Sequence, residues 1–259
     1  ALRMSMTLLT HRYNMSGHSK WNSIKHKKGA LDAKRGKIFT RHAKMITIAA
    51  RGGADAEMNP ALRSAIINAK ADNVPNANIE KAVKKGAGMD KDALVLEELM
   101  YEAVGPGGTA FLIEVITDNR NRSVASVKTI VTKLGGNMGS SGSSAWMFDH
   151  KGMILAKALG KNEEEAELEI IDAGAEDFEL EDGVFQIMTD FTELMHVRDK
   201  LEKSGFVIER AEGAFIPKNP LLIKDEEAKN KIMRLIDTLE DDDDVTIVHS
   251  NCEFYDSNL

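Results

Sequence analysis

The sequence contains a single cysteine, Cys252, and no apolar run long enough to cross a bilayer. One cysteine excludes an internal disulfide, and it also excludes the CxxC pairs and Cys/His clusters that hold structural zinc. A membrane-spanning helix needs about 20 predominantly apolar residues, and the chain has no apolar window of that order. We therefore expect a globular protein of a reducing compartment, located in the cytoplasm.

The common signatures of nucleotide-binding and hydrolytic enzymes are missing as well. The chain has no GxxxxGK[ST] loop, no GxGxxG at a strand-to-helix turn, no GxSxG and no HExxH. Gly105-Pro106-Gly107-Gly108 comes nearest to a phosphate-binding loop, but strand-like residues follow it where a helix N-terminus would be needed. The acidic run Glu240–Asp244 lacks the glycine and distal glutamate of an EF-hand, which favours a solvated turn. We expect no catalytic residues, no metal and no cofactor, and hence a protein that is not an enzyme.

Charge is distributed very unevenly along the chain. The formal net charge of the 259 residues is -7, but residues 1–88 carry 17 Lys/Arg and 5 Asp/Glu, a net +12. Residues 89–259 carry 17 and 36, a net -19. A basic first third joined to an acidic remainder is typical of a polyanion-binding module attached to something else.

Four units are predicted along the chain. Residues 1–15 are an appendage or leader; the first fourteen are acid-free, as in a mitochondrial presequence, but they are few and lack an amphipathic period. We favour an expression remnant or an early start codon over a mitochondrial matrix location. Residues 16–88 form a basic helical domain, residues 89–142 plus 211–259 form an α+β domain, and residues 143–210 form a second α+β domain inserted in it.

The helical domain follows from periodicity and capping signals. In residues 34–51, Phe39, Ala43, Ile46 and Ala50 lie on one helix face, and five cations lie on the opposite face: Lys34, Lys37, Arg41, Lys44 and Arg51. Arg35 and Ile48 depart from this pattern. Gly52-Gly53 ends this helix. Further helices are predicted over 59–72, opened by an Asn-Pro cap, and over 78–85.

Strands and helices alternate after Gly88, which predicts the fold class α+β with two two-layer sandwiches. Tight turns and glycine pairs mark the element ends. The predicted strands are 99–104, 110–117, 144–148, 153–156, 178–180, 184–188, 206–210, 214–217 and 245–250. The predicted helices are 121–134, 162–173, 192–203 and 225–239.

The cations of the basic domain are the candidate nucleic-acid contacts. Lysines reach phosphate oxygens, while an indole or imidazole can stack on a base. The alternative for Trp21 is that it packs on the helical domain. The candidate residues are Lys20, Trp21, Lys25, His26, Lys27, Lys28, Lys34, Arg35, Lys37, Arg41 and Lys44.

Arg120 and Arg122 stand beside a predicted helix N-terminus, where free N–H groups favour anions. They are a possible second anion contact. The alternative is a capped turn in which these arginines form ion pairs within the acidic domain.

Six motifs, in order, resemble the YebC family. They extend from about Met15 to Glu253. They are Gly17-His18-Ser19-Lys20-Trp21, Lys34-Arg35-Gly36-Lys37-Ile38-Phe39, Tyr101-Glu102 with Gly105-Pro106-Gly107-Gly108, Thr117-Asp118-Asn119-Arg120-Asn121-Arg122, Gly174-Ala175-Glu176-Asp177 and Met233-Arg234-Leu235-Ile236-Asp237.

The resemblance implies three domains, one helical and two α+β. It also implies a regulator of gene expression: bacterial members are described as probable DNA-binding transcriptional regulators. Others act in translation at the ribosome, relieving stalling on proline-rich stretches, and a mitochondrial relative activates translation of a cytochrome oxidase subunit.

Our leading hypothesis is a non-enzymatic regulator that binds nucleic acid, DNA or ribosomal RNA, through the basic domain. The first alternative is a ribosome-associated translation factor that binds ribosomal RNA. The second is a protein-interaction module whose basic stripe docks an acidic partner. No helix-turn-helix pattern with base-contacting side chains supports sequence-specific reading of DNA.

Overall fold

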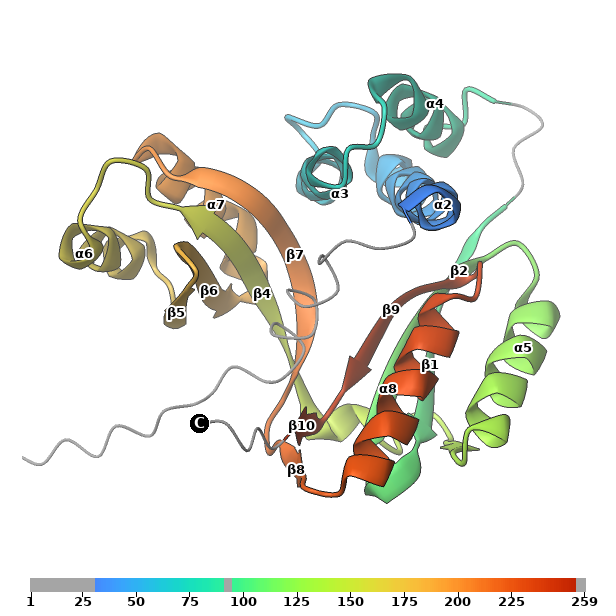
Figure 1. Cartoon of the computed structure of the whole chain (residues 1–259). Coiled ribbons are helices and arrows are strands. Elements are labelled where there is room, and N and C mark those ends of the chain that lie inside the picture. The colour runs from blue at the N-terminus through green and yellow to red at the C-terminus, as the bar shows by residue number, and fades with distance from the viewer. Residues whose placement is uncertain (1–30, 91–94, 255–259) are drawn as a thin grey trace, which may run out of the picture.

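The computed structural model describes residues 31–90 and 95–254, apart from the side chains of residues 31–34. Figure 1 shows three bodies: a group of helices from the first third of the chain, a sheet backed by two helices, and a second α+β unit. The mixed α+β class predicted from the sequence is confirmed.

The helical domain consists of α2 (Leu31–Ala49), η1 (Ala50–Gly52), α3 (Pro60–Ala71) and α4 (Asn76–Gly86). The predicted cap is confirmed, because the Asn59 side chain accepts a hydrogen bond from the backbone N–H of Leu62. The predicted apolar face of α2 packs in one core with α3 and α4. Gly86 allows α4 to approach α2 closely, since a Cβ there would collide with the Thr47 carbonyl oxygen.

The host α+β domain is built on one antiparallel sheet in the order β3-β1-β2-β9. Its strands are β1 (Glu97–Val104), β2 (Ala110–Thr117), β3 (Asn137–Met138) and β9 (Val245–Ser250). The turn η2 (Pro106–Gly108) joins β1 to β2 and places Val104 opposite Ala110. A short parallel pair, β8 (Leu221–Ile223) and β10 (Cys252–Phe254), adjoins this sheet.

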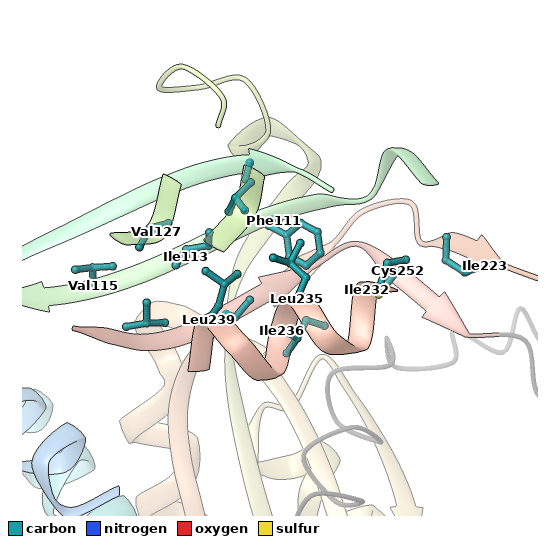
Figure 2. Close-up of a cluster of buried hydrophobic side chains, with 14 residues drawn as sticks. Phe111, Ile113, Val115, Val127, Ile223, Ile232, Leu235, Ile236, Leu239 and Cys252 are labelled. Atoms are coloured by element: carbon teal, nitrogen blue, oxygen red, sulfur yellow. The ribbon is translucent and has the colours of Figure 1, made fainter. Parts of the chain in front are cut away.

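Two helices, α5 (Arg120–Lys133) and α8 (Glu226–Glu240), lie on the same face of the host sheet (Figure 1). Figure 2 shows Leu235 and Leu239 of α8 directed at Phe111 and Ile113 of β2. All four side chains are fully buried, and at about 25 cal/mol per Å² of buried apolar surface this layer provides much of the domain's stability.

The inserted domain has the element order β-α-β-β-α-β, the ferredoxin-like arrangement. Its elements are β4 (Phe148–Lys157), α6 (Glu163–Ala173), β5 (Asp177–Glu181), β6 (Val184–Asp190), η4 (Phe191–Glu193), α7 (Leu194–Lys203) and β7 (Val207–Pro217). The antiparallel sheet order is β5-β6-β4-β7, with α6 and α7 packed on one face. A short turn, η3 (Ala145–Met147), precedes β4.

Two predicted strand pairs are wrong, because each pair is one continuous strand in the structure. The chain has one strand over 148–157 instead of 144–148 and 153–156, and one over 207–217 instead of 206–210 and 214–217. Gly152 lies against Thr189 and Leu194, and Gly213 lies against Phe191, so both glycines serve close packing rather than a turn. The predicted boundary at 210/211 falls inside β7, and we propose that the inserted domain extends to Pro217.

A buried carboxylate holds the loop that leads from β3 into the inserted domain. Glu102 on β1 is 6% exposed and accepts hydrogen bonds from the backbone N–H groups of Gly142, Ser144 and Ala145. Burial raises the pKa of the Glu102 carboxyl, but these backbone bonds outweigh it and leave the pKa below its usual value. The ionised form of Glu102 therefore stabilises the folded loop.

Glu102→Gln should lower the free energy of unfolding at neutral pH by about 1–3 kcal/mol, because one amide cannot accept the bonds that the carboxylate accepts. The pKa of Glu102 is lower in the folded protein than in the unfolded chain. The carboxylate therefore stabilises the folded protein at pH values above its unfolded pKa, and this contribution is lost as the pH falls through the folded pKa. Urea unfolding at pH 7 and pH 4 should show a larger variant effect at pH 7. Equal effects at both pH values would contradict this role.

Candidate nucleic-acid interface

The first group of predicted contacts lies outside the described residues. This group comprises Lys20, Trp21, Lys25, His26, Lys27 and Lys28, whose roles stay predictions. Lys34 lies in the first turns of α2, and its side chain is also outside the description. The structure therefore places four of the predicted cations: Arg35, Lys37, Arg41 and Lys44, all on α2.

Three of these four cations contact the acidic turn that follows α8. The Lys37 Nζ donates to the Asp241 carbonyl oxygen at 2.6 Å, and an Arg41 Nη2 donates to the Glu240 carbonyl oxygen at 3.2 Å. The Lys44 Nζ donates to the Asp243 carbonyl oxygen at 2.8 Å. The fourth cation, Arg35, is exposed and forms no ion pair with any residue that the structure describes. One face of α2 is thus covered by residues 240–244, which we call the acidic turn.

The acidic turn attracts cations for two physical reasons. The last carbonyl groups of a helix have no partner within the helix and carry the negative end of its dipole, and α8 ends at Glu240. The carboxylates of the turn add to this field, with an Asp241 oxygen 3.9 Å from the Lys37 Nζ. Burial lowers the pKa of the Arg41 guanidinium, and the nearby Asp72 carboxylate opposes that shift.

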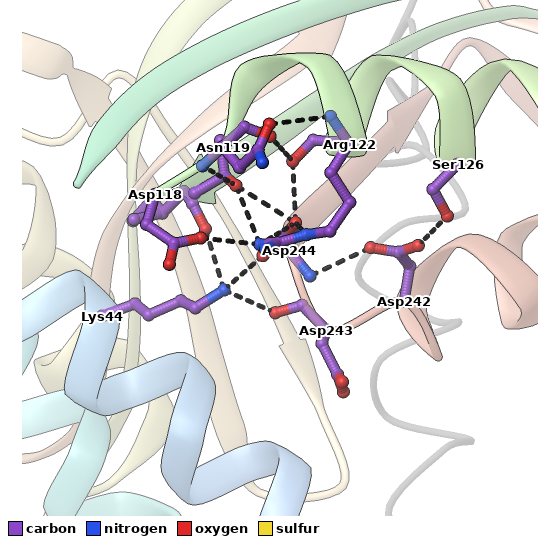
Figure 3. Close-up of polar contacts among 11 residues, drawn as sticks. Lys44, Asp118, Asn119, Arg122, Ser126, Asp242, Asp243 and Asp244 are labelled. Atoms are coloured by element: carbon purple, nitrogen blue, oxygen red, sulfur yellow. Dashed lines mark hydrogen bonds and ion pairs between the residues drawn. The ribbon is translucent and has the colours of Figure 1, made fainter. Parts of the chain in front are cut away.

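Asp244 is the deepest acid of the turn and joins three segments of the chain (Figure 3). Its carboxylate accepts hydrogen bonds from Lys44 at 2.8 Å, from Arg122 at 2.9 Å and from Ser123 at 2.7 Å. Burial raises the pKa of this carboxyl, but the three donors outweigh burial and lower the pKa to about 2. The carboxylate is therefore held ionised in the folded protein.

The acidic turn is not the solvated turn expected from the sequence. Asp244 is 6% exposed, and the Asp242 carboxylate accepts hydrogen bonds from Ser126 of α5 and from the Asp244 backbone N–H. The sequence does contain a signal for the contact between α2 and the acidic turn, because the two segments carry opposite charges. Sequence reasoning treated each charged segment alone and missed the pairing.

Arg122 forms ion pairs within the host domain, which is the alternative that we gave for this residue in place of an anion contact. It contacts Asp118 at 2.7 Å as well as Asp244, and both acids raise the pKa of its guanidinium. The Asn119 side chain caps α5 by accepting from the Arg122 backbone N–H. Arg120 is exposed. The two arginines therefore do not converge on one anion site in this structure.

The helical domain also contacts the inserted domain through polar groups. The Asn68 side chain of α3 accepts from the Ala211 backbone N–H of β7 at 3.0 Å and donates to its carbonyl oxygen at 3.1 Å. The Asp72 carboxylate accepts from Arg210 at 2.8 Å and lies 2.6 Å from the His42 Nε2. None of these partners was identified from the sequence, because polar residues inside a helical pattern carry no signal of what faces them.

Cations that sequence reasoning missed remain uncovered on α3 and α4. Lys70, Lys81 and Lys84 are exposed, and none forms an ion pair with a residue in the described ranges. Within residues 35–90 and 95–254, no group of three or more His, Cys, Asp or Glu side chains is arranged to hold a metal ion. No described helix combines the length and apolar character that a bilayer crossing requires.

Asp244→Asn should lower the free energy of unfolding at neutral pH by about 2 kcal/mol, since each unit of pKa shift corresponds to about 1.4 kcal/mol. The folded pKa is lowered, so this stabilisation is present above the unfolded pKa near 4 and is lost as the pH falls toward 2. Chemical unfolding across that range should give a flatter profile for the variant. Parallel profiles for the two proteins would refute the prediction.

Comparisons with known proteins cover nearly the whole chain. A family model described as TACO1/YebC protein N-terminal domain matches residues 19–89, and one described as TACO1/YebC second and third domain matches residues 96–252. A protein of Geotalea uraniireducens, named probable transcriptional regulatory protein, is 50% identical over 95% of this chain and 98% of its own length.

A Finegoldia magna protein of the same name is 48% identical over 92% of this chain and 98% of its own. The crystal structure of a conserved hypothetical protein from Aquifex aeolicus superposes with a TM-score of 0.83 at 42% identity, covering 93% of this chain and 99% of that one. The chain therefore belongs to the TACO1/YebC family, as the order of its sequence motifs indicates.

Proposed function

We propose that this protein is a non-enzymatic, nucleic-acid-binding regulator of gene expression. The cationic face of α2 and the uncovered lysines of α3 and α4 contact phosphate groups, and the cytoplasm is where it acts. The relatives named probable transcriptional regulatory proteins support a regulatory role. Phosphate contacts position a protein on a polymer without reading its sequence.

The observation that carries the proposal is the spacing of cations on α2. Lys37, Arg41 and Lys44 stand four and three residues apart, so they occupy one face over about 10 Å of helix. A strand of duplex DNA presents about three phosphates over that length. All three side chains already bind oxygen atoms, the type of acceptor that a phosphate offers.

The alternatives differ in the nucleic acid that the protein binds. A transcriptional regulator would bind DNA, whereas a ribosome-associated translation factor would bind ribosomal RNA. Crosslinking the protein to nucleic acid in cells and sequencing the bound fragments distinguishes them: promoter fragments support the first, and ribosomal RNA supports the second. A protein-docking role for the basic stripe predicts partners that stay bound after nuclease treatment.

Replacing Lys34, Lys37, Arg41 and Lys44 together by glutamine should weaken nucleic-acid binding regardless of sequence. On duplex DNA, the slope of log K against log salt should fall by ~0.9 for each phosphate that the variant no longer neutralises. Fluorescence anisotropy over a salt series measures both quantities, for DNA and for ribosomal RNA fragments.

A matched control variant carries glutamine at four exposed lysines outside the helical domain. These are Lys128, Lys133, Lys203 and Lys224. Both variants lose four positive charges, so they separate a local contact from net charge. If the α2 variant and the control bind alike, the assignment of α2 fails.

A further inference from the structure

We propose that the acidic turn acts as an intramolecular competitor for nucleic acid, so that the helical domain must move away from it before α2 can bind phosphates. This inference rests on the proposed function and concerns the regulation of the same site. Three carbonyl oxygens and the Asp244 carboxylate occupy the positions around Lys37, Arg41 and Lys44 that phosphate oxygens would take. The closed arrangement is the one that Figure 3 shows for Lys44.

The coverage of α2 is graded along the helix. The Lys37 side chain is 46% exposed, whereas that of Lys44 is 17% exposed and bonded to three acceptors, the Ile116 carbonyl oxygen among them. A phosphate chain approaching the closed protein can therefore reach Arg35 and Lys37 at the start of α2 before it reaches Lys44. Binding along the whole face requires that Lys44 exchange its partners.

The hydrophobic core of the helical domain is separate from the cores of the other two domains. Its buried apolar cluster consists of residues from 39 to 83 only, and the clusters of the host and inserted domains contain none of them. Hydrogen bonds and ion pairs join this domain to the rest of the chain at the acidic turn, at Asn68 of α3 and at Asp72, which follows α3. Arg51 adds a hydrogen bond to the Leu96 carbonyl oxygen. Polar contacts are typical of interfaces between domains that move, and water and salt weaken those that are exposed, such as Lys37 with Asp241.

The competition has a definite selectivity. Weakly bound or isolated anions do not displace a turn that presents several oxygens at once, because the turn is tethered to the same chain and has a high effective concentration. A polyanion that offers several consecutive phosphates can replace all of these acceptors together. The turn would thus restrict α2 to extended polyanions and suppress binding to single phosphates.

The test uses the full-length chain with Asp241→Asn and Asp243→Asn, which removes two exposed carboxylates of the turn and keeps every carbonyl acceptor. The control, Glu163→Gln with Glu164→Gln, removes two exposed carboxylates at the start of α6. The probes are a single-stranded oligouridylate and a mixed-sequence DNA duplex. Movement of the helical domain away from the turn is measured by the rate at which Lys44 is acetylated without nucleic acid. Mass spectrometry gives this rate, and exposed Lys70 is the reference. Thermal unfolding verifies that both variants are folded.

The turn variant should bind both probes about fivefold more tightly than the control, as expected for removing the weak ion pair of Asp241 with Lys37 and the negative charge of Asp243. Its Lys44 should be acetylated faster, while Lys70 is unchanged. In the wild type, added salt should also speed acetylation of Lys44, because salt screens the turn.

Unchanged acetylation of Lys44 in the turn variant, or equal affinities of the turn variant and the control, would overturn the competitor role. Absence of binding by all three proteins at low salt would instead overturn the proposed function. The acetylation result, obtained without nucleic acid, would in that case still decide whether the turn covers Lys44.

Discussion

The carboxylate of Asp244 is the point on which the relative placement of α2, α5 and α8 depends. It accepts a hydrogen bond from Lys44 in the helical domain and others from Arg122 and Ser123 at the start of α5. Because it is buried, an unpaired charge there would be costly. Arg122 and Ser123 bind it from within the host domain, and Lys44 adds the link to α2. The acidic turn, the cap of α5 and the contact with α2 are therefore one connected polar network rather than three separate contacts.

Much of the fold could be predicted because its signals are local. Asn59 before Pro60 and Asn119 before α5 are caps that work through bonds to residues three positions away. Strands 110–117 and 245–250 were predicted at their observed bounds, since both are apolar runs between turn residues. The apolar face of α2 likewise needed only helical geometry.

The errors and omissions have the opposite origin, in contacts between residues distant in sequence. Gly152 and Gly213 resemble breaks locally, yet their role is set by Thr189, Leu194 and Phe191 across the fold. The pairing of Lys44 with Asp244 joins residues 200 positions apart, and no periodicity reports such a pair. The cationic face was predictable from the sequence, whereas what covers it was not.

The inserted domain leaves and rejoins the host through strands that lie side by side. Phe148, where β4 begins, pairs directly with Pro217, where β7 ends, and Phe148 packs on Ala110 and Leu112 of the host sheet. Paired residues of this kind stand only about 5 Å apart, a gap that a tight turn spans. A tight turn could therefore replace this 70-residue segment without reordering the host strands, and such a deletion would uncover Ala110 and Leu112 on the host sheet.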